Sequence, residues 1–197
     1  MSLLGFFWLL EKNVEIVFLM EIEFQCQVII SSCNELAISV KSDNTIHCWA
    51  LIQSILFACA SISKILCPPT PRDKSLINEC KERGEYLVKK LSINESSYLV
   101  SKHLRKDFEC LDESLHSWAK GSNNVLVHRN IEPQRFMPVD NPSKVSVMAN
   151  FDPHTFTLTL LEKEVPIKEI LYESTKLLMR TQNNIRKLNG IWFQMFC

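Results

Sequence analysis

The feature that most restricts the fold is a helical spacing of apolar residues in the first third of the chain. Between residues 22 and 66 they recur at steps of three and four in two runs: Ile22, Cys26, Ile29, Cys33, Leu36 and Val40, then Trp49, Ile52, Leu56, Cys59, Ile62 and Leu66. Such spacing is typical of one face of an amphipathic helix. A polar turn at 41–44 separates the runs, and prolines at 68, 69 and 71 end the second because proline lacks a backbone donor. We therefore predict antiparallel helices over about 22–40 and 45–66.

Two further helices are expected before residue 121. The first covers about 73–91, where Ile77, Cys80, Leu87 and Leu91 face inward and Gly84 costs about 1 kcal/mol relative to alanine. The second covers about 97–120, and its stripe is Leu104, Phe108, Leu111, Leu115 and Trp118. Gly121 then supplies a C-terminal stop.

The pattern changes after Gly121. A short β-branched run at 125–127 precedes a proline-containing loop at 132–143, and 150–153 is expected to turn. Residues 155–160 alternate between polar and apolar, which indicates a strand, and 161–165 are expected to return as its partner. Pro166 opens a last helix over about 167–188. The expected fold class is mainly α: an antiparallel helical bundle with a small β-hairpin appendage and a C-terminal helix.

Length and composition favour one folded domain. The chain has 197 residues, of which 46% are hydrophobic and 22% charged. The expected domain covers 21–188, with the bundle at 21–121, the loop and hairpin at 122–166 and the closing helix at 167–188. A tail at 189–197 is unplaced. Residues 1–20 form an apolar extension with two interpretations: a helix that packs on the body, or an upstream segment before a true start at Met20.

The charges and the cysteines restrict partners and location. With 22 basic and 22 acidic residues, the chain lacks the charge excess of a general polyanion binder. Neither apolar run near the N-terminus reaches the length of a membrane span, and no signal-peptide pattern is present. The eight cysteines form no CxxC and no zinc-type spacing, which favours reduced core thiols. We therefore expect a cytoplasmic protein with no membrane partner, no metal and no cofactor.

The candidate site lies on the predicted helix at 97–120. Arg105, Glu109, Asp112 and His116 repeat at steps of four and three on the face next to the apolar stripe. The alternative for any such set is a solvated face with ion pairs of about 0.2–0.5 kcal/mol each. The sequence has no P-loop, GxGxxG, GxSxG, HExxH or EF-hand motif, which excludes most nucleotide-binding and hydrolase classes.

Several short motifs, taken in order, resemble an uncharacterised bacterial branch of the HEPN-like helical bundles. The resemblance spans roughly residues 23–187, and its motifs are Asn34-Glu35-Leu36, residues 49–66 with the prolines that follow, Arg83-Gly84, the Leu-Arg-x-x-Phe-Glu-x-x-Asp-Glu-x-Leu pattern at 104–115, His128-Arg129-Asn130-Ile131 and Asn150-Phe151-Asp152-Pro153. HEPN domains are dimeric bundles, and many are metal-independent ribonucleases in toxin–antitoxin or defence systems. Their signature is an Arg, often followed by Asn, with a His four to six residues later. The Arg would hold the scissile phosphate and the His would exchange protons.

This chain departs from that signature. Arg105 matches the arginine, but Lys106 replaces the usual polar residue and Cys110 replaces the histidine. A thiol is a weak hydrogen-bonding substitute for imidazole. The resemblance therefore implies a homodimer with a degenerate ribonuclease motif, acting as a non-catalytic interaction or regulatory module with an RNA or protein partner.

Two alternatives remain open. One is a metal-independent endoribonuclease with a rearranged site of Arg105 with His116 or His128, and the other is a purely structural bundle. The candidate catalytic residues are Arg105, Cys110 and His116, and the candidate RNA-binding residues are Lys102, Lys106 and Arg129.

Overall fold

A computed structural model of the chain describes residues 3–42, 44–102, 105–106, 111–121, 125–132 and 145–196. Over these residues the protein is mainly helical. Its three long helices are α1 (Leu3–Ser39), α2 (Thr45–Leu66) and α6 (Ile167–Phe196). A small four-stranded sheet precedes α6. The predicted mainly helical class, with a small strand region and a C-terminal helix, is confirmed.

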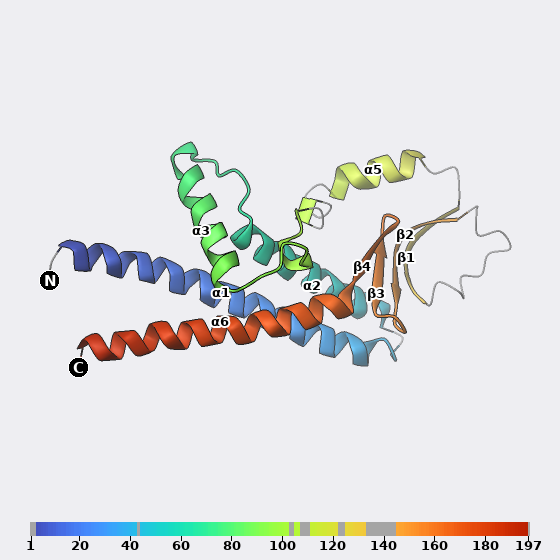
Figure 1. The fold of residues 1–197 in the computed structure, drawn as a ribbon. Helices are drawn as coiled ribbons and strands as arrows, with labels where there is room; N and C mark the ends of the chain where they lie inside the picture. Colours follow the sequence, from blue (N-terminus) through green and yellow to red (C-terminus); the bar gives the residue numbers. More distant parts are fainter. Residues whose placement is uncertain are drawn as a thin grey trace.

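Helix α1 forms the centre of the helical part because it packs against both α2 and α6. Figure 1 shows α1 and α6 running antiparallel side by side, with both chain ends at the same end of the molecule. The two predicted stripes face this core: every member from Ile22 to Leu36 and from Trp49 to Leu66 is buried, and Val40 is half-buried. Asn44 begins α2 by accepting a hydrogen bond from the His47 N–H at 3.0 Å.

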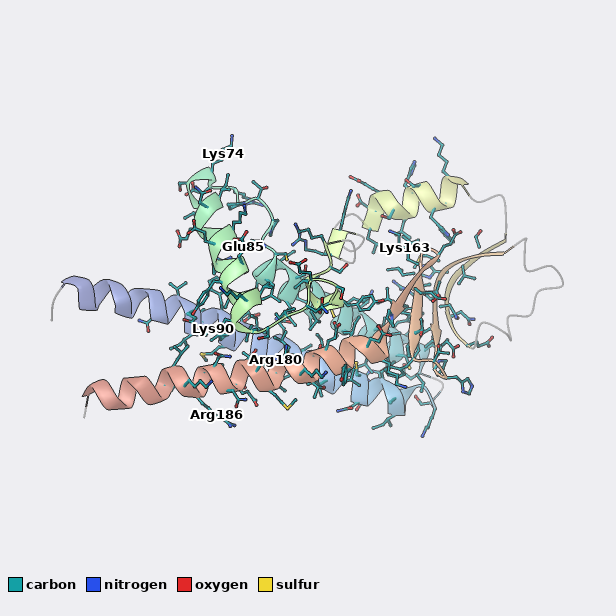
Figure 2. All side chains as sticks on the ribbon, in the orientation of Figure 1. Lys74, Glu85, Lys90, Lys163, Arg180 and Arg186 are labelled. Carbon is teal, nitrogen blue, oxygen red and sulfur yellow. The ribbon has the colours of Figure 1, made fainter. Side chains whose placement is uncertain are left out.

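Helix α3 (Ile77–Lys90) follows the 3-10 helix η1 (Lys74–Leu76) and crosses the C-terminal end of α2. Its backbone comes very close there, since a Cβ built on Gly84 would lie 2.6 Å from the Leu66 carbonyl oxygen. At its other end Lys90 and Tyr86 both donate hydrogen bonds to the Glu15 carboxylate of α1. Figure 2 shows α3 projecting away from α1, with Lys90 at the contact.

The sheet has the order β1-β2-β3-β4 and stands at the end of the molecule opposite the chain termini (Figure 1). Its strands are β1 (Val125–Ile131), β2 (Val145–Asp152), β3 (Thr157–Leu160) and β4 (Lys163–Pro166). The pair β1/β2 is parallel and the other two pairs are antiparallel. Phe151 is fully buried and meets Phe156 edge to face at 5.2 Å between ring centroids. Because β4 runs directly into α6, the sheet is tied to the helical core.

The predicted continuous helix over 97–120 is wrong at its start. Residues Tyr98–Val100 form a 3-10 helix, η2, and Ser101 is extended with φ −65° and ψ 111°. The reason is tertiary: the Glu173 carboxylate of α6 accepts hydrogen bonds from the Ser97 hydroxyl at 2.7 Å and the Tyr98 N–H at 3.1 Å. The later part of the prediction survives as α5 (Leu111–Gly121), which stands apart from α1 and α6 in Figure 1.

Three further differences concern where elements begin and end. The turn predicted at 150–153 begins too early, since Asn150 and Phe151 belong to β2 and pair with β1. The unplaced tail from residue 189 continues α6 as far as Phe196. The residues from Leu3 onward belong to α1, the same helix that carries the apolar stripe beginning at Ile22. Leu19, which precedes that stripe, is fully buried.

Candidate functional site

Arg105 holds the end of α2. Its Nη1 donates a hydrogen bond to the Cys67 carbonyl at 2.6 Å, and only 9% of the residue is exposed. Cys67 is the C-cap of α2, where carbonyl groups lack partners within the helix. A guanidinium at this position satisfies one of those carbonyls and also interacts favourably with the negative end of the helix dipole. The arginine that matches the HEPN signature therefore makes a contact with the backbone of its own chain.

The other residues expected near Arg105 are only partly described. Lys102 and Lys106 are both exposed, as a phosphate contact requires. Cys110 lies outside the described residues, so the structure gives no account of its surroundings. His116 is exposed on α5, the helix on which Leu115 and Trp118 are half-buried against the core.

Arg129 lies at the other end of α2. Its guanidinium stands 5.6 Å from the centroid of the ring of Trp49, which lies near the start of that helix. Cys67 follows Trp49 by five helical turns, which is about 27 Å at 1.5 Å per residue. The structure therefore does not bring Arg129 together with Arg105. The neighbouring His128 is exposed.

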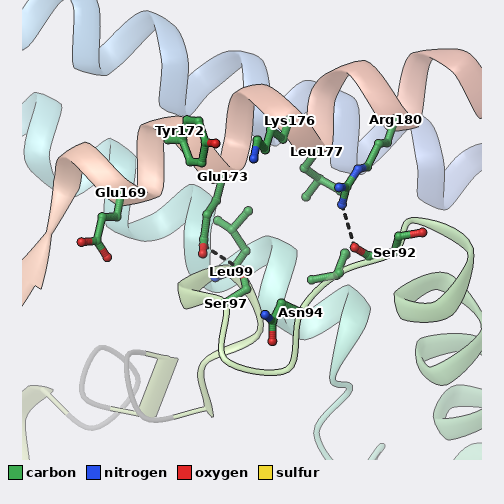
Figure 3. A pocket seen from close by; sticks show the side chains of 11 residues that line it. Ser92, Asn94, Ser97, Leu99, Glu169, Tyr172, Glu173, Lys176, Leu177 and Arg180 are labelled. Carbon is green, nitrogen blue, oxygen red and sulfur yellow. Dashed lines mark hydrogen bonds between the residues drawn. The ribbon is translucent and has the colours of Figure 1, made fainter.

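A cavity of about 390 Å³, here called the α6 cavity, lies between α6 and the segment 92–99. Figure 3 shows Glu169, Tyr172, Lys176 and Arg180 along its α6 side. Arg180 donates from Nη1 to the carbonyl oxygens of Leu91 at 3.0 Å and Ser92 at 2.7 Å. Lys176 places its Nζ 4.0 Å from the centre of the Tyr172 ring.

Two charged residues of the α6 cavity, Glu173 and Arg180, hold the segment 92–99 against α6 through hydrogen bonds. Together with the contacts of Glu173 to Ser97 and Tyr98, Arg180 holds both ends of the segment 92–99 against α6. The sequence contains a signal for this cavity. Glu169, Glu173, Lys176 and Arg180 share one helical face, and that face is too polar to pack in a bundle core.

A second cavity of about 340 Å³, here called the Cys67 cavity, lies where α3 meets the end of α2. It is lined by the proline segment 68–71 and by Cys67, Cys80, Lys81, Glu85 and Lys102. Lys81 and Glu85 form an ion pair at 3.8 Å on the exposed side of α3. Lys102, one of the predicted RNA-binding residues, lines this cavity. Arg105 donates a hydrogen bond to the carbonyl of Cys67, another lining residue.

The described residues hold no metal-binding cluster, and two of the helices are long and apolar. In the part of the chain that the structure describes, no three His, Cys, Asp or Glu residues gather as a metal site. Two helical segments, Asn13–Ser39 and Thr45–Leu66, are long and apolar enough to cross a membrane. The window in Asn13–Ser39 is 39% buried inside the protein and the window in Thr45–Leu66 is 61% buried. By length and composition alone, core helices and signal sequences pass the same test.

Comparison with known proteins gives no match: no family model fits the chain, and no curated protein or solved structure is significantly similar to it.

Proposed function

We propose that the protein is a HEPN-like interaction module in which the signature arginine has become a structural residue and no ribonuclease activity remains. The observation that carries this proposal is the position of Arg105. A catalytic arginine has to present its guanidinium to a phosphate from solvent, whereas Arg105 is 9% exposed and donates to the Cys67 carbonyl. Breaking that contact to bind RNA would leave a carbonyl at the end of α2 without this donor.

The surface of α1 supports an interaction role. Val17, Met20 and Phe24 are spaced by three and four residues, so they lie on one face of the helix, and they are 63%, 55% and 56% exposed. Large apolar side chains grouped on an exposed face commonly mark contacts with other proteins. Since the resemblance implies a dimer, we propose that this face mediates association with a second copy.

The loss of catalysis is tested by incubating the full-length protein with structured and unstructured RNA in the presence of EDTA. We expect no cleavage by the wild type. Metal-independent cleavage that disappears in Arg105→Ala, while the circular dichroism spectrum of that variant is unchanged, would overturn the proposal and assign an endoribonuclease instead. His116→Ala and His128→Ala would then identify the proton-transfer residue.

Association is tested separately by light scattering over a range of protein concentrations. We expect a dimer for the wild type and a monomer for Met20→Glu. Phe57→Glu is the matched control, because Phe57 is a large apolar residue on α2 that is 63% exposed and does not belong to this face. A monomeric wild type, or a dimer that Met20→Glu leaves intact, would exclude this face as the dimer contact.

A further inference from the structure

The cysteines in the described part of the chain fall into two groups that differ in access. Cys26, Cys33, Cys48 and Cys59 are buried, with at most 1% of each residue exposed. Cys67 and Cys80 are half-buried, and both line the Cys67 cavity. Reaction with a soluble reagent requires access, so only the second group presents thiols to a small molecule.

Cys67 and Cys80 line the same cavity because α3 approaches the end of α2 closely. Gly84 lets the backbone of α3 approach the end of α2, where a Cβ at that position would lie 2.6 Å from the Leu66 carbonyl oxygen and 2.7 Å from Pro68 Cδ. Cys67 stands between those two contacted residues. Cys80 precedes Gly84 by four residues, so it lies on the same face of α3 one turn away. Both thiols are therefore held at the same crossing of two elements.

The charged groups at the cavity favour an anionic reagent. Lys81 and Lys102 line it with one acidic residue, Glu85. Arg83 adds a further cation, since its Nη1 lies 3.7 Å from the Cys80 sulfur as a hydrogen-bond donor. Small disulfides such as oxidised glutathione carry several carboxylates and would be attracted to this surface.

We propose that Cys67 and Cys80 are a thiol pair that is converted to an intramolecular disulfide by exchange with a low-molecular-weight disulfide. One thiolate attacks a sulfur of the small disulfide, forms a mixed disulfide and releases the first small thiol. The other cysteine then attacks the protein sulfur of that mixed disulfide and releases the second small thiol. Two protein thiols are oxidised, the small disulfide is reduced to two thiols, and the two protons pass to the released thiols.

For the buried cysteines, closeness to another cysteine is not sufficient for oxidation by a soluble disulfide. Burial raises the pKa of Cys59, and its electrostatic neighbours Cys33 and Cys26 raise that pKa further. Burial also raises the pKa values of Cys26 and Cys33 to about 12. These thiols have neighbours but neither access nor thiolate character, so they remain reduced under conditions that oxidise the pair at the cavity.

The disulfide would add a covalent link at the point where Arg105 holds the Cys67 carbonyl. It would tie α3 to the end of α2 and restrict the proline segment between them. We expect the midpoint of thermal unfolding to rise by roughly 5 °C on oxidation. This inference rests on the Cys67 cavity alone and does not depend on the proposed function.

The experiment uses the full-length protein equilibrated with oxidised and reduced glutathione, quenched with acid, alkylated, and digested with trypsin without reduction. Cleavage after Lys64, Arg72, Lys74 and Lys81 separates the two cysteines into peptides 65–72 and 75–81. We expect these two peptides to be found joined by a disulfide. In Cys80→Ser we expect Cys67 to keep a bound glutathione, because the second exchange cannot occur. The control Cys33→Ser should form the linked peptides as the wild type does.

Three results would overturn the proposal. The first is glutathione retained on Cys67 and Cys80 of the wild type without a link. The second is a disulfide from either residue to another cysteine of the chain. The third is no loss of free thiols at a glutathione ratio that fully oxidises a reference dithiol peptide.

Discussion

Replacing Gly84 with alanine is the sharpest test of how α3 is placed. In an exposed helix, Gly→Ala stabilises by about 1 kcal/mol because alanine has the higher helix propensity. Here the new Cβ would meet the Leu66 carbonyl oxygen at 2.6 Å and Pro68 Cδ at 2.7 Å, and neither neighbour is the end of a flexible side chain. Overpacking of this kind costs about 1–3 kcal/mol, which offsets or exceeds the gain in propensity.

We therefore expect Gly84→Ala to lower the free energy of unfolding by up to about 2 kcal/mol, measured by urea titration followed by circular dichroism. The corresponding fall in the thermal midpoint is up to roughly 8 °C for a chain of this size. Gly121 provides the matched control, because a Cβ there would meet nothing within 4 Å. Gly121→Ala should leave stability unchanged or slightly raised. If Gly84→Ala stabilises the protein as much as Gly121→Ala, the close approach of α3 to α2 is wrong.

Three other predictions concern single contacts. Glu173→Ala should lower the free energy of unfolding by about 1–3 kcal/mol, because it leaves two donors of the η2 turn without their acceptor. The control Glu169→Ala, at an exposed position of the same helix, should change that free energy by less than about 0.5 kcal/mol. Glu162→Gly should raise the free energy of unfolding by about 0.5–1 kcal/mol, because residue 162 has φ 68° in the turn between β3 and β4. Burial opposes the charge of Lys90, yet its hydrogen bonds to Glu15 and a neighbouring tyrosine leave its pKa raised. The stabilisation by Lys90 relative to Lys90→Met should therefore be complete below about pH 10.4 and fade as the pH rises further, as measured by urea titrations at pH 8 and pH 11.5.

The helices that the sequence predicts well are those whose pattern is set by one continuous buried face. The stripes from Ile22 and from Trp49 are long, regular and bounded by a polar turn and by prolines, and the structure buries both. The hairpin of β3 and β4 is predicted from the alternation at 155–160 and a returning partner at 161–165, whereas β4 begins only at Lys163. Its turn residues, Leu161 and Glu162, lack the usual Asn-Gly signal although both have positive φ.

The predictions fail where a distant residue decides the local conformation. Nothing local in residues 97–101 prevents an α-helix, and the carboxylate that holds them as a 3-10 turn comes from Glu173, some 75 positions later. Strand β2 likewise depends on parallel pairing with β1 across a long connection. Ile77, expected inward, is 38% exposed and lines the Cys67 cavity.

The candidate site also depends on contacts between residues that are far apart in the sequence. The sequence indicates Arg105 as a candidate catalytic residue. Its spacing to the residues that follow, however, carries no information about the end of α2. The contact with the Cys67 carbonyl joins residues 38 positions apart. The same holds for the Cys67 cavity, whose two cysteines belong to different predicted helices and are joined only by the approach at Gly84.

The central claim is that Arg105 supports the fold, and the stabilities of Arg105→Gln and Lys106→Gln test it most directly. The two positions are adjacent and both are cationic, but Arg105 is buried against α2 whereas Lys106 is exposed. We expect Arg105→Gln to lower the free energy of unfolding by roughly 1.5–3 kcal/mol and Lys106→Gln to change it by less than about 0.5 kcal/mol. Equal, small effects at both positions would contradict the account, because an arginine kept for binding phosphate can be removed without loss of stability.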